Sequence, residues 1–349
     1  MLRFITKRLL QGIAVLFLVV IIISSIIYLA PVEPERLTFG QRYDLSTMEA
    51  KKKELGLDRS LFIQLLFYIR DISPISFHEN NPQAQDKYNY IKILPLGANA
   101  LVVKLPYLRE SFQSGRSVSA MLFEKLPQTA ILALVAILLG LLVGIILGII
   151  SALNHNNWFD NSAVVSSVIG ISIPSYVSAM ILALVFAYYF KWFEVSGSLY
   201  GLDDFGDKKI FWKNLVLPAI ALGIRPIAII TQLTRSAMLD VLSQDYIRTA
   251  KAKGLSYYKV VFKHALRNAL NPVLTAASGW FAALLAGAFF VENVFDYNGL
   301  GQLTVNALLS YDIPLVLGAV LLTACIFVVL NILVDVLYAV LDPRVRFQE

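Results

Sequence analysis

Six long apolar runs constrain this 349-residue chain more than any other feature of its sequence. A helix needs about 20 apolar residues, each rising about 1.5 Å, to cross roughly 30 Å of hydrocarbon. All six runs are long enough. We therefore predict an all-α membrane protein with six transmembrane helices, which occupy Leu9–Ala30, Leu126–Leu153, Asn161–Phe190, Leu215–Thr234, Ala269–Val291 and Ile313–Leu341.

Charged residues are nearly absent from these runs. The chain is 57% hydrophobic and only 15% charged, which is too apolar for a soluble surface. Arg225 in the fourth run and Asp335 in the sixth are the only charges that the runs contain. The first run has 22 residues and therefore exceeds the apolar core of about 7–15 residues in a signal peptide, so we interpret it as an uncleaved span.

Basic residues set the orientation. Seven of them lie in the segment between the fourth and fifth runs, residues 235–268, against only Asp240 and Asp245: Arg235, Arg248, Lys251, Lys253, Lys259, Lys263 and Arg267. Short basic loops stay in the cytoplasm, whereas segments beyond about 60 residues escape this rule. We expect residues 235–268, 1–8 and 342–349 to be cytoplasmic, and residues 31–125 to be extracytoplasmic.

The long segment 31–125 contains signals for local structure. Ser46–Glu49 is a capping box that opens a helix, and Gly56 can close it. Asp58 can cap a second helix, because four apolar residues follow at helical spacing: Leu61, Leu65, Leu66 and Ile69. The Pro and Asn residues of Ser73–Gln85 indicate a loop, and Tyr88–Val103 predicts a short strand.

Residues typical of catalysis are sparse. His78, His155 and His264 lie far apart in the sequence, and Cys325 is the only cysteine, so we expect no metal centre, cofactor or disulfide. No Gly-Lys pair occurs, which excludes a phosphate-binding GxxxxGK[ST] loop. The basic residues report topology before any partner, and we expect no nucleic acid. We predict that the chain is not an enzyme and that any ATP is hydrolysed by another protein.

The cytoplasmic segment predicts two short helices. Ser243 can cap the first, and Gly254 can take the left-handed conformation that ends it. The second covers Tyr257–Leu270, with Lys259, Lys263 and Arg267 on one face. Ala250 and Ala252 have small side chains, which would let another protein pack closely against one surface of the first helix. The residues alone leave two interpretations open: a docking surface for another protein, or an elbow whose lysines face lipid phosphates.

A family resemblance extends along most of the chain. Asp245-Tyr-Ile-Arg-Thr-Ala-Lys-Ala-Lys-Gly-Leu255, followed by Lys263–Pro272, resembles the loop of peptide/nickel-type permeases of ATP-binding-cassette importers. The similarity continues in five further segments: Leu55–Arg59, Gly115–Ser117, Ile173–Ser175, Glu292–Gly301 and Leu341–Arg344. Arg248-Thr249-Ala250 departs from the Glu-Ala-Ala of the wider family, and the region around Ser73–Val103 is longer than in the subfamily.

The resemblance implies a type I importer permease fold in a bacterial cytoplasmic (inner) membrane. It implies that the loop is a coupling helix that docks into a groove of an ATPase, through Asp245, Tyr246, Arg248, Thr249, Ala250 and Gly254. It also implies four kinds of partner: a second homologous permease, two cytoplasmic ATP-binding subunits, an extracytoplasmic solute-binding protein and membrane lipid. Peptides, nickel chelates, glutathione and certain glycans all remain possible solutes.

Polar and small residues inside the spans allow two interpretations each. Arg225 lies near the bilayer centre and either faces a solute cavity, or forms a buried ion pair or snorkels toward the surface, and we favour a pair with Asp335. Glycines in the second span (Gly140, Gly144 and Gly148) indicate close helix packing rather than a solute path, and Pro174 and Pro218 indicate kinks.

Three classes of function fit these features to different degrees. A gradient-driven secondary transporter would need acidic groups or broken helices at mid-membrane, for which Asp335 alone is thin support. A non-transport membrane scaffold would not need a rigid basic elbow. We therefore predict a transmembrane permease subunit of an ATP-binding-cassette importer, which forms half of a translocation pathway.

Overall fold

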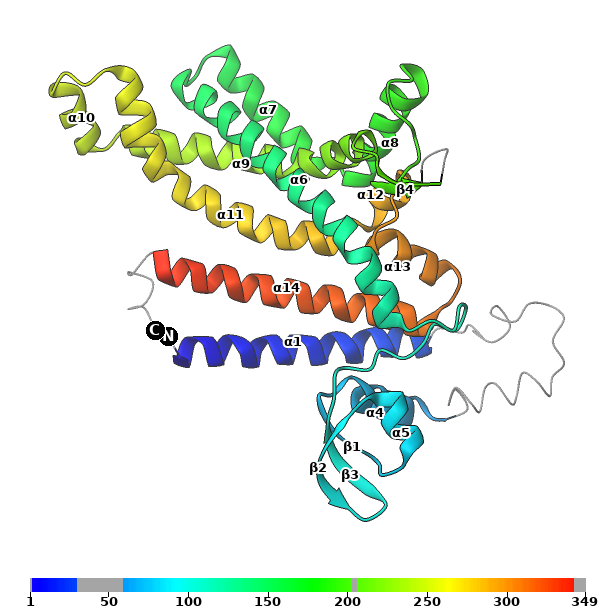
Figure 1. The fold of residues 1–349 in the computed structure, drawn as a ribbon. Helices are drawn as coiled ribbons and strands as arrows, with labels where there is room; N and C mark the ends of the chain where they lie inside the picture. The colour runs from blue at the N-terminus through cyan, green and yellow to red at the C-terminus, as the bar shows by residue number, and fades with distance from the viewer. Residues whose placement is uncertain (1, 30–58, 203–205, 342–349) are drawn as a thin grey trace. The chain divides into compact units, whose positions relative to one another are not determined.

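The computed structural model describes residues 2–29, 59–202 and 206–341 (Figure 1), so the helix predicted to start at Ser46 lies outside the described residues. The chain separates into two compact units. Unit 1 contains residues 1–6, 126–302 and 326–349, and unit 2 contains residues 7–125 and 303–325.

Unit 1 is mostly helical and contains one two-stranded antiparallel sheet, β4 (Tyr200–Leu202) with β5 (Lys208–Ile210). The helices that lie wholly in unit 1 are α7 (Trp158–Ser172), α8 (Ser175–Leu182), the π-helix η1 (Ala183–Tyr189), α9 (Lys213–Leu242), α10 (Asp245–Ala252), the π-helix η2 (Lys259–Ala265), α11 (Leu266–Gly287) and α12 (Phe289–Val294). Among the helices that are divided between the units are α6 (Val118–Leu153), α13 (Leu300–Leu309) and α14 (Ile313–Leu341).

Helix α6 packs against α9 through its glycines. A Cβ atom built on Gly140, Gly144 or Gly148 would come within 2.8, 2.7 or 2.5 Å of Pro226, Ile230 or Thr234, in that order. Side chains cannot be accommodated at such separations, so the glycines let the two helices approach closely. The prediction that this face packs against another helix is confirmed.

Within the described part of the chain, the candidate membrane spans match five of the six predicted runs, one of them as a bent helix pair, and the fifth predicted run, Ala269–Val291, is not among them. Among the described residues, four helices are long and apolar enough to cross a membrane, within α1 (Leu2–Leu29), α6, α9 and α14, and a bent helix pair makes a fifth. The bent pair is the predicted third span: it turns by 103° between α7 and the α8–η1 segment, where Pro174 follows Ile173. Proline removes a backbone donor and disfavours helical geometry in the preceding residue, which breaks the helix here.

Unit 2 contains a small α/β domain, so the all-α prediction is wrong for residues 75–103. Strands β1 (Ile75–Glu79), β3 (Asn99–Val103) and β2 (Ile91–Leu96) form an antiparallel sheet in the order β1-β3-β2. Helix α5 (Pro82–Tyr88) covers one face, where Tyr90, Ala100 and Val102 pack against Ala84 and Tyr88.

The region predicted to be a loop, Ser73–Gln85, is therefore a strand followed by a helix. Asn81 accepts a hydrogen bond from the backbone N–H of Ala84 (2.7 Å), and Pro82 occupies the first turn. Asn at the N-cap and Pro in the first turn start helices as readily as they mark loops, which explains the error. The strand predicted within Tyr88–Val103 is confirmed as β2 and β3.

The predicted second helix of this region is also confirmed. Helix α4 (Leu61–Ile72) follows Ser60, and its residues Leu65, Tyr68, Ile69 and Ile72 pack against α1 and the start of α14. The predicted cap, Asp58, lies outside the described residues.

Candidate functional site

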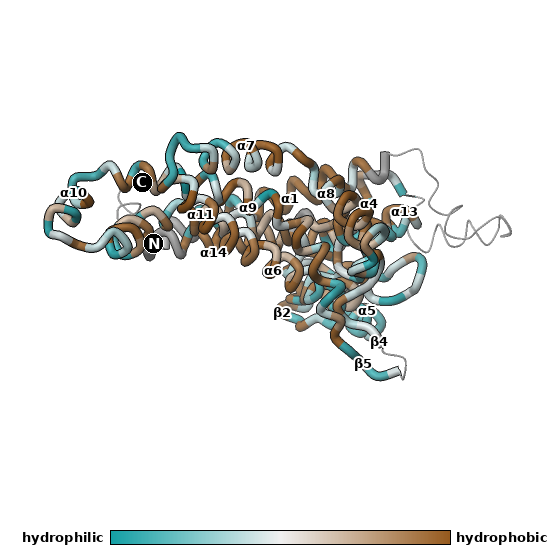
Figure 2. Tube along the Cα trace, turned by 90° about the horizontal axis from the view of Figure 1, so that it is seen from above, coloured by the Kyte–Doolittle hydropathy of each residue, from teal (hydrophilic) through white to brown (hydrophobic). Residues whose placement is uncertain are grey.

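The loop between α9 and α11 contains the predicted coupling helix, α10. In Figure 2 this end of the molecule alternates between polar and apolar residues, whereas the long helices are apolar over most of their length. Gln244, rather than the predicted Ser243, is the residue that precedes α10. Ser243 instead closes α9, because its N–H donates to the carbonyl of Leu239 (3.3 Å).

A complete Schellman motif ends α10. Gly254 has φ of +73°, its N–H donates to the carbonyl of Lys251 (3.0 Å), and the N–H of Leu255 donates to that of Ala250 (3.4 Å). These two bonds satisfy carbonyls that a helix end otherwise leaves unpaired, and glycine takes the left-handed conformation without a steric penalty. The predicted closing conformation of Gly254 is confirmed.

The inner face of α10 anchors it to the neighbouring helices. Ile247 and Ala250 are buried, in a cluster with residues of α6, α9, η2 and α11: Ala152, Met238, Val260, Val261, Ala265 and Ala269. Ala250 is only 7% exposed, so the expectation that it keeps an outer contact surface low does not match the structure. The small side chain of Ala250 instead lets α10 pack closely onto the helices behind it.

The outer face of α10 is polar and accessible. The side chains of Asp245 and Arg248 are 94% and 76% exposed and lie 3.3 Å apart, an exposed pair that contributes little to stability. The Thr249 hydroxyl donates to the carbonyl of Asp245 (3.0 Å), and the Tyr246 hydroxyl accepts from the Asn268 side-chain amide on α11 (2.8 Å). The structure therefore brings five of the six predicted coupling residues to one accessible region and buries the sixth.

The second predicted helix, Tyr257–Leu270, is not a separate element. The π-helix η2 passes directly into α11, since Leu266 at the junction retains helical geometry, with φ of −58° and ψ of −42°. Its basic residues, Lys259, Lys263 and Arg267, are all exposed as expected. Helix α10 thus packs against the start of a much longer helix.

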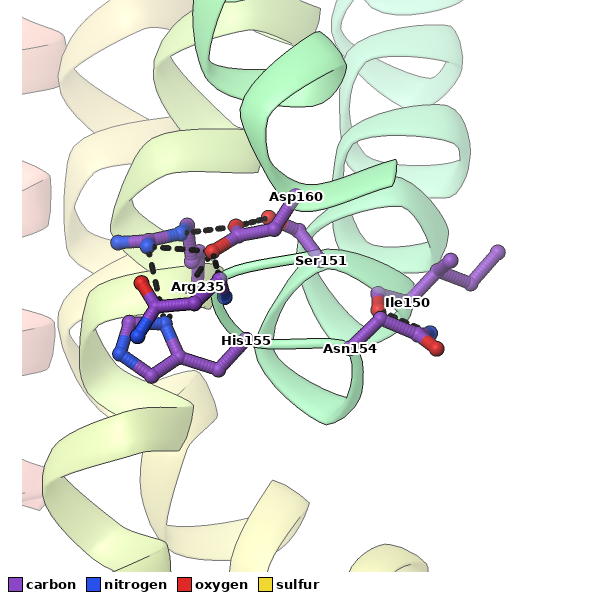
Figure 3. Close-up of polar contacts among 7 residues, drawn as sticks. Ile150, Ser151, Asn154, His155, Asp160 and Arg235 are labelled. Carbon is purple, nitrogen blue, oxygen red and sulfur yellow. Dashed lines mark hydrogen bonds and ion pairs between the residues drawn. The ribbon is translucent and has the colours of Figure 1, made fainter. Parts of the chain in front are cut away.

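An ion-pair network that the sequence analysis missed lies beside this loop (Figure 3). Asp160, in the first turn of α7, accepts hydrogen bonds from Nε and Nη2 of Arg235 on α9 at 2.5 and 2.7 Å. The carboxylate also accepts from the Ser151 hydroxyl on α6 (2.5 Å) and the backbone N–H of Asn156 (3.0 Å). His155 Nδ1 lies 3.2 Å from both partners. Three helices are joined through one carboxylate.

Burial makes this network energetically important. The side chain of Asp160 is 1% exposed and that of Arg235 is 24% exposed. Removing one partner of a buried ion pair leaves an uncompensated charge and costs about 3–5 kcal/mol. The sequence shows that Asp160 and Arg235 are charged residues directly beside predicted spans. Their spacing in the sequence does not indicate that the two side chains form an ion pair.

A second buried carboxylate holds the segment after α11, outside the candidate spans. Glu292 on α12 accepts from the Thr129 hydroxyl (2.6 Å) and from the backbone N–H groups of Gly301 (2.7 Å) and Gln302 (3.1 Å) in the first turn of α13. Burial raises the pKa of Glu292 to about 7, although these hydrogen bonds act in the opposite direction. Gly299 lies so close that a Cβ atom there would be 2.4 Å from the carboxylate.

Arg225 and Asp335 are not brought together as an ion pair within the described residues. Arg225 Nε instead donates to the carbonyl of Ile171 (3.3 Å), in the last turn of α7. Carbonyls at a helix end have no partner within the helix, and Pro174 removes a further donor, so this turn offers acceptors to a nearby cation. The contact that Arg225 makes is therefore with the carbonyl of Ile171 rather than with Asp335, the partner favoured from the sequence.

Within the same described part of the chain, no group of three or more His, Cys, Asp or Glu side chains is arranged to hold a metal ion.

Comparison with known proteins assigns a family. The family model for the binding-protein-dependent transport system inner membrane component matches residues 144–347, and the model for the N-terminal part of such components matches residues 1–133. A putative peptide transport system permease protein of Brucella abortus is 35% identical over 98% of both chains. The di/tripeptide transport system permease protein DppB of Pseudomonas aeruginosa is 34% identical, and the glutathione transport system permease protein GsiC of Escherichia coli is 32% identical, each over 100% of both chains.

An amino acid ABC transporter of known structure aligns with 65% of this chain and 94% of its own, at 15% identity and a TM-score of 0.46. The chain belongs to the family of binding-protein-dependent transport system inner membrane components. It is a permease subunit of an ATP-binding-cassette importer and a multi-pass protein of the inner membrane, so the secondary-transporter and scaffold alternatives are set aside. Such a permease works with ATPase and substrate-binding subunits.

Proposed function

We propose that this subunit forms half of a translocation pathway for peptides or a similar small solute. The names of its relatives support this class, since they carry peptides, di- and tripeptides or glutathione. In this proposal a second homologous permease completes the pathway, two cytoplasmic ATPases drive it, and an extracytoplasmic binding protein delivers the solute.

The proposed topology has six spans with both termini in the cytoplasm. In addition to the candidate spans, α11 supplies the remaining crossing, and the residue 235–268 segment with its seven basic side chains is cytoplasmic. The segment after α11 carries Glu292, Asp296 and Asp312 without Lys or Arg up to the start of α14, as expected on the opposite side.

We assign ATPase coupling to the outer face of α10. The observation that carries the assignment is its construction: the inner face is buried among four neighbouring elements, a Schellman motif fixes the end, and the outer face stays accessible. A short helix held this rigidly can transmit displacement, whereas a flexible loop would absorb it. Asp245, Tyr246, Arg248, Thr249 and Gly254 are the contact residues in this assignment, and Ala250 positions the helix.

Substitution of Gly254 tests the coupling role. A Cβ atom on Gly254 would meet nothing within 4 Å, so a side chain there has room in this subunit and would collide only with a partner. Asparagine tolerates the left-handed conformation better than most residues, which separates backbone strain from the volume added at the interface. Gly254→Asn and Gly254→Asp should both abolish solute uptake while the chain still inserts.

Gly97, in the β2–β3 turn, provides the matched control. It has φ of +66° and also open space around its Cβ position, so Gly97→Asn introduces similar strain far from the coupling loop in sequence. Uptake by Gly97→Asn should equal that of the wild type. Normal uptake with a retained ATPase in Gly254→Asp would show that α10 does not couple the subunits.

A further inference from the structure

Helix α4 packs against the part of α1 that forms its candidate membrane span. Tyr68 of α4 is buried in a cluster with Val20 of α1, and Ile23 packs against the same cluster. The candidate span of α1 is Thr6–Ile26, and Val20 lies six residues before its end, or about 9 Å along the helix axis. Helix α4 therefore lies at the depth of one leaflet, within the region that the sequence analysis treated as extracytoplasmic.

The opposite face of α4 is apolar and uncovered within its unit. Phe62, Ile63 and Leu66 are 70%, 40% and 50% exposed. The first nine residues of α4 are nearly all apolar or aromatic, with Gln64 as the exception: Leu-Phe-Ile-Gln-Leu-Leu-Phe-Tyr-Ile. A helix that is apolar on both faces belongs in a protein core or in lipid. Its depth beside α1 favours lipid.

Two guanidinium groups flank this apolar face. Cζ of Arg59 and Cζ of Arg70 each lie 4.7 Å from the ring centroid of Phe67. The carboxylate of Asp71 lies 3.8 Å from Nη2 of Arg70 and 2.9 Å from Nε of Arg109, so one carboxylate faces two guanidiniums. Among the described residues here, three guanidiniums stand against one carboxylate, an excess that complements a phosphate group, and arginine binds phosphate oxygens in a bidentate manner.

We propose that α4 is a phospholipid-binding helix embedded in the membrane surface. Phe62, Ile63 and Leu66 contact acyl chains, while Arg59 and Arg70 bind the phosphate of the headgroup. With the proposed orientation of α1, this is the outer leaflet. The arrangement has both features of an interfacial helix, namely buried apolar area and basic residues at headgroup level. It attaches the β1-β3-β2 domain to the membrane surface through a helix already packed on α1 and α14.

Spin labels on the exposed face test the proposal. Single cysteines replace Phe62 or Leu66 in a Cys325→Ser background, and the full chain, with the subunits that co-purify with it, is placed in nanodiscs of phosphatidylethanolamine and phosphatidylglycerol. Phe17→Cys, exposed on the α1 span, and Gln83→Cys, exposed on α5, are the lipid and water controls. Labels at Phe62 and Leu66 should match Phe17: high collision rates with oxygen and low rates with a water-soluble nickel chelate.

Each other result overturns the assignment. High nickel access, as at Gln83, would place α4 in water, and low access to both reagents would mean that a protein partner covers the face. The headgroup contact is tested by Arg59→Glu with the label at Leu66. This reversal should raise nickel access at least twofold, whereas Lys92→Glu, an exposed charge on β2, should leave it unchanged. An unchanged value in Arg59→Glu refutes the phosphate contact.

Discussion

The Asp160–Arg235 pair gives a prediction whose sign and size follow from the structure. Arg235→Met removes the two strongest donors to a carboxylate that is 1% exposed, and leaves the Ser151 hydroxyl, the Asn156 N–H and His155. The uncompensated buried charge should lower the free energy of unfolding by about 3–5 kcal/mol. This should be among the most destabilising single substitutions in unit 1.

Asp160→Asn should cost less. The side chain keeps its size, and the guanidinium of Arg235 is 24% exposed, so it can turn toward the aqueous phase when its partner loses charge. We expect a loss of about 1–3 kcal/mol, which reflects the hydrogen bonds to a charged acceptor. The double variant Asp160→Asn with Arg235→Met should be more stable than the sum of the single losses predicts.

The assay is reversible unfolding of the purified chain in detergent or nanodiscs, analysed as a double-mutant cycle. Arg248→Met is the matched control, because its pair with Asp245 is exposed and should contribute at most about 1 kcal/mol. Residues that share a network show coupling of about 0.5–3 kcal/mol. If the losses at positions 160 and 235 add within about 0.5 kcal/mol, the two side chains act independently and the reasoning is refuted.

Three further predictions concern Glu292, His78 and Arg225. Because burial raises the pKa of Glu292 from 4.5 to about 7, the folded chain binds more protons across this interval and its stability should fall as pH rises through it; Glu292→Gln should remove that dependence from thermal unfolding curves. Burial, with Arg70 and Lys104 nearby, lowers the pKa of His78 from 6.5 to about 4, so stability should instead rise with pH between these values. Hydrogen exchange of residues 75–103, corrected for the intrinsic pH effect, should show this in the wild type and not in His78→Asn. Arg225→Met, which removes the contact with Ile171, should reduce uptake, and Arg225→Lys should restore less than half of it if the planar guanidinium is required; equal uptake in both variants and the wild type would exclude a role for this contact.

Hydrophobic length predicted four candidate spans as single helices, within α1, α6, α9 and α14, because crossing hydrocarbon imposes a minimum apolar length that any sequence must meet. The predicted sixth span, Ile313–Leu341, coincides with α14. The third span failed as a single straight helix, since the apolar run continues through Ile173-Pro174 while the backbone turns by 103°. Hydropathy reflects the free energy of transferring side chains from water to an apolar phase. It contains no information about the backbone N–H that Pro174 lacks.

Local chemistry also predicted the end of α10, since the conformational preference of Gly254 belongs to a single residue. The orientation of Ala250 was not predictable in the same way. Ala250 and Ala252 lie two residues apart, so they point to different sides of a helix, and only the packing of Val260 and Val261 shows which side is buried. The Asp160–Arg235 contact joins residues 75 positions apart, and no periodicity in a single sequence encodes such a pairing.

Helix α9 connects the Asp160–Arg235 network with α10. Arg235 lies seven residues before Leu242, the end of α9, and only Ser243 and Gln244 separate that end from α10. Asp160 and Ser151 tie Arg235 to α7 and α6, while Met238 packs in the cluster beneath α10. Buried contacts therefore link α10 to α6, α7 and α9, which is the connection that the proposed coupling role needs. If α10 couples the ATPase to the spans as proposed, the loss of stability expected in Arg235→Met should be accompanied by a loss of transport.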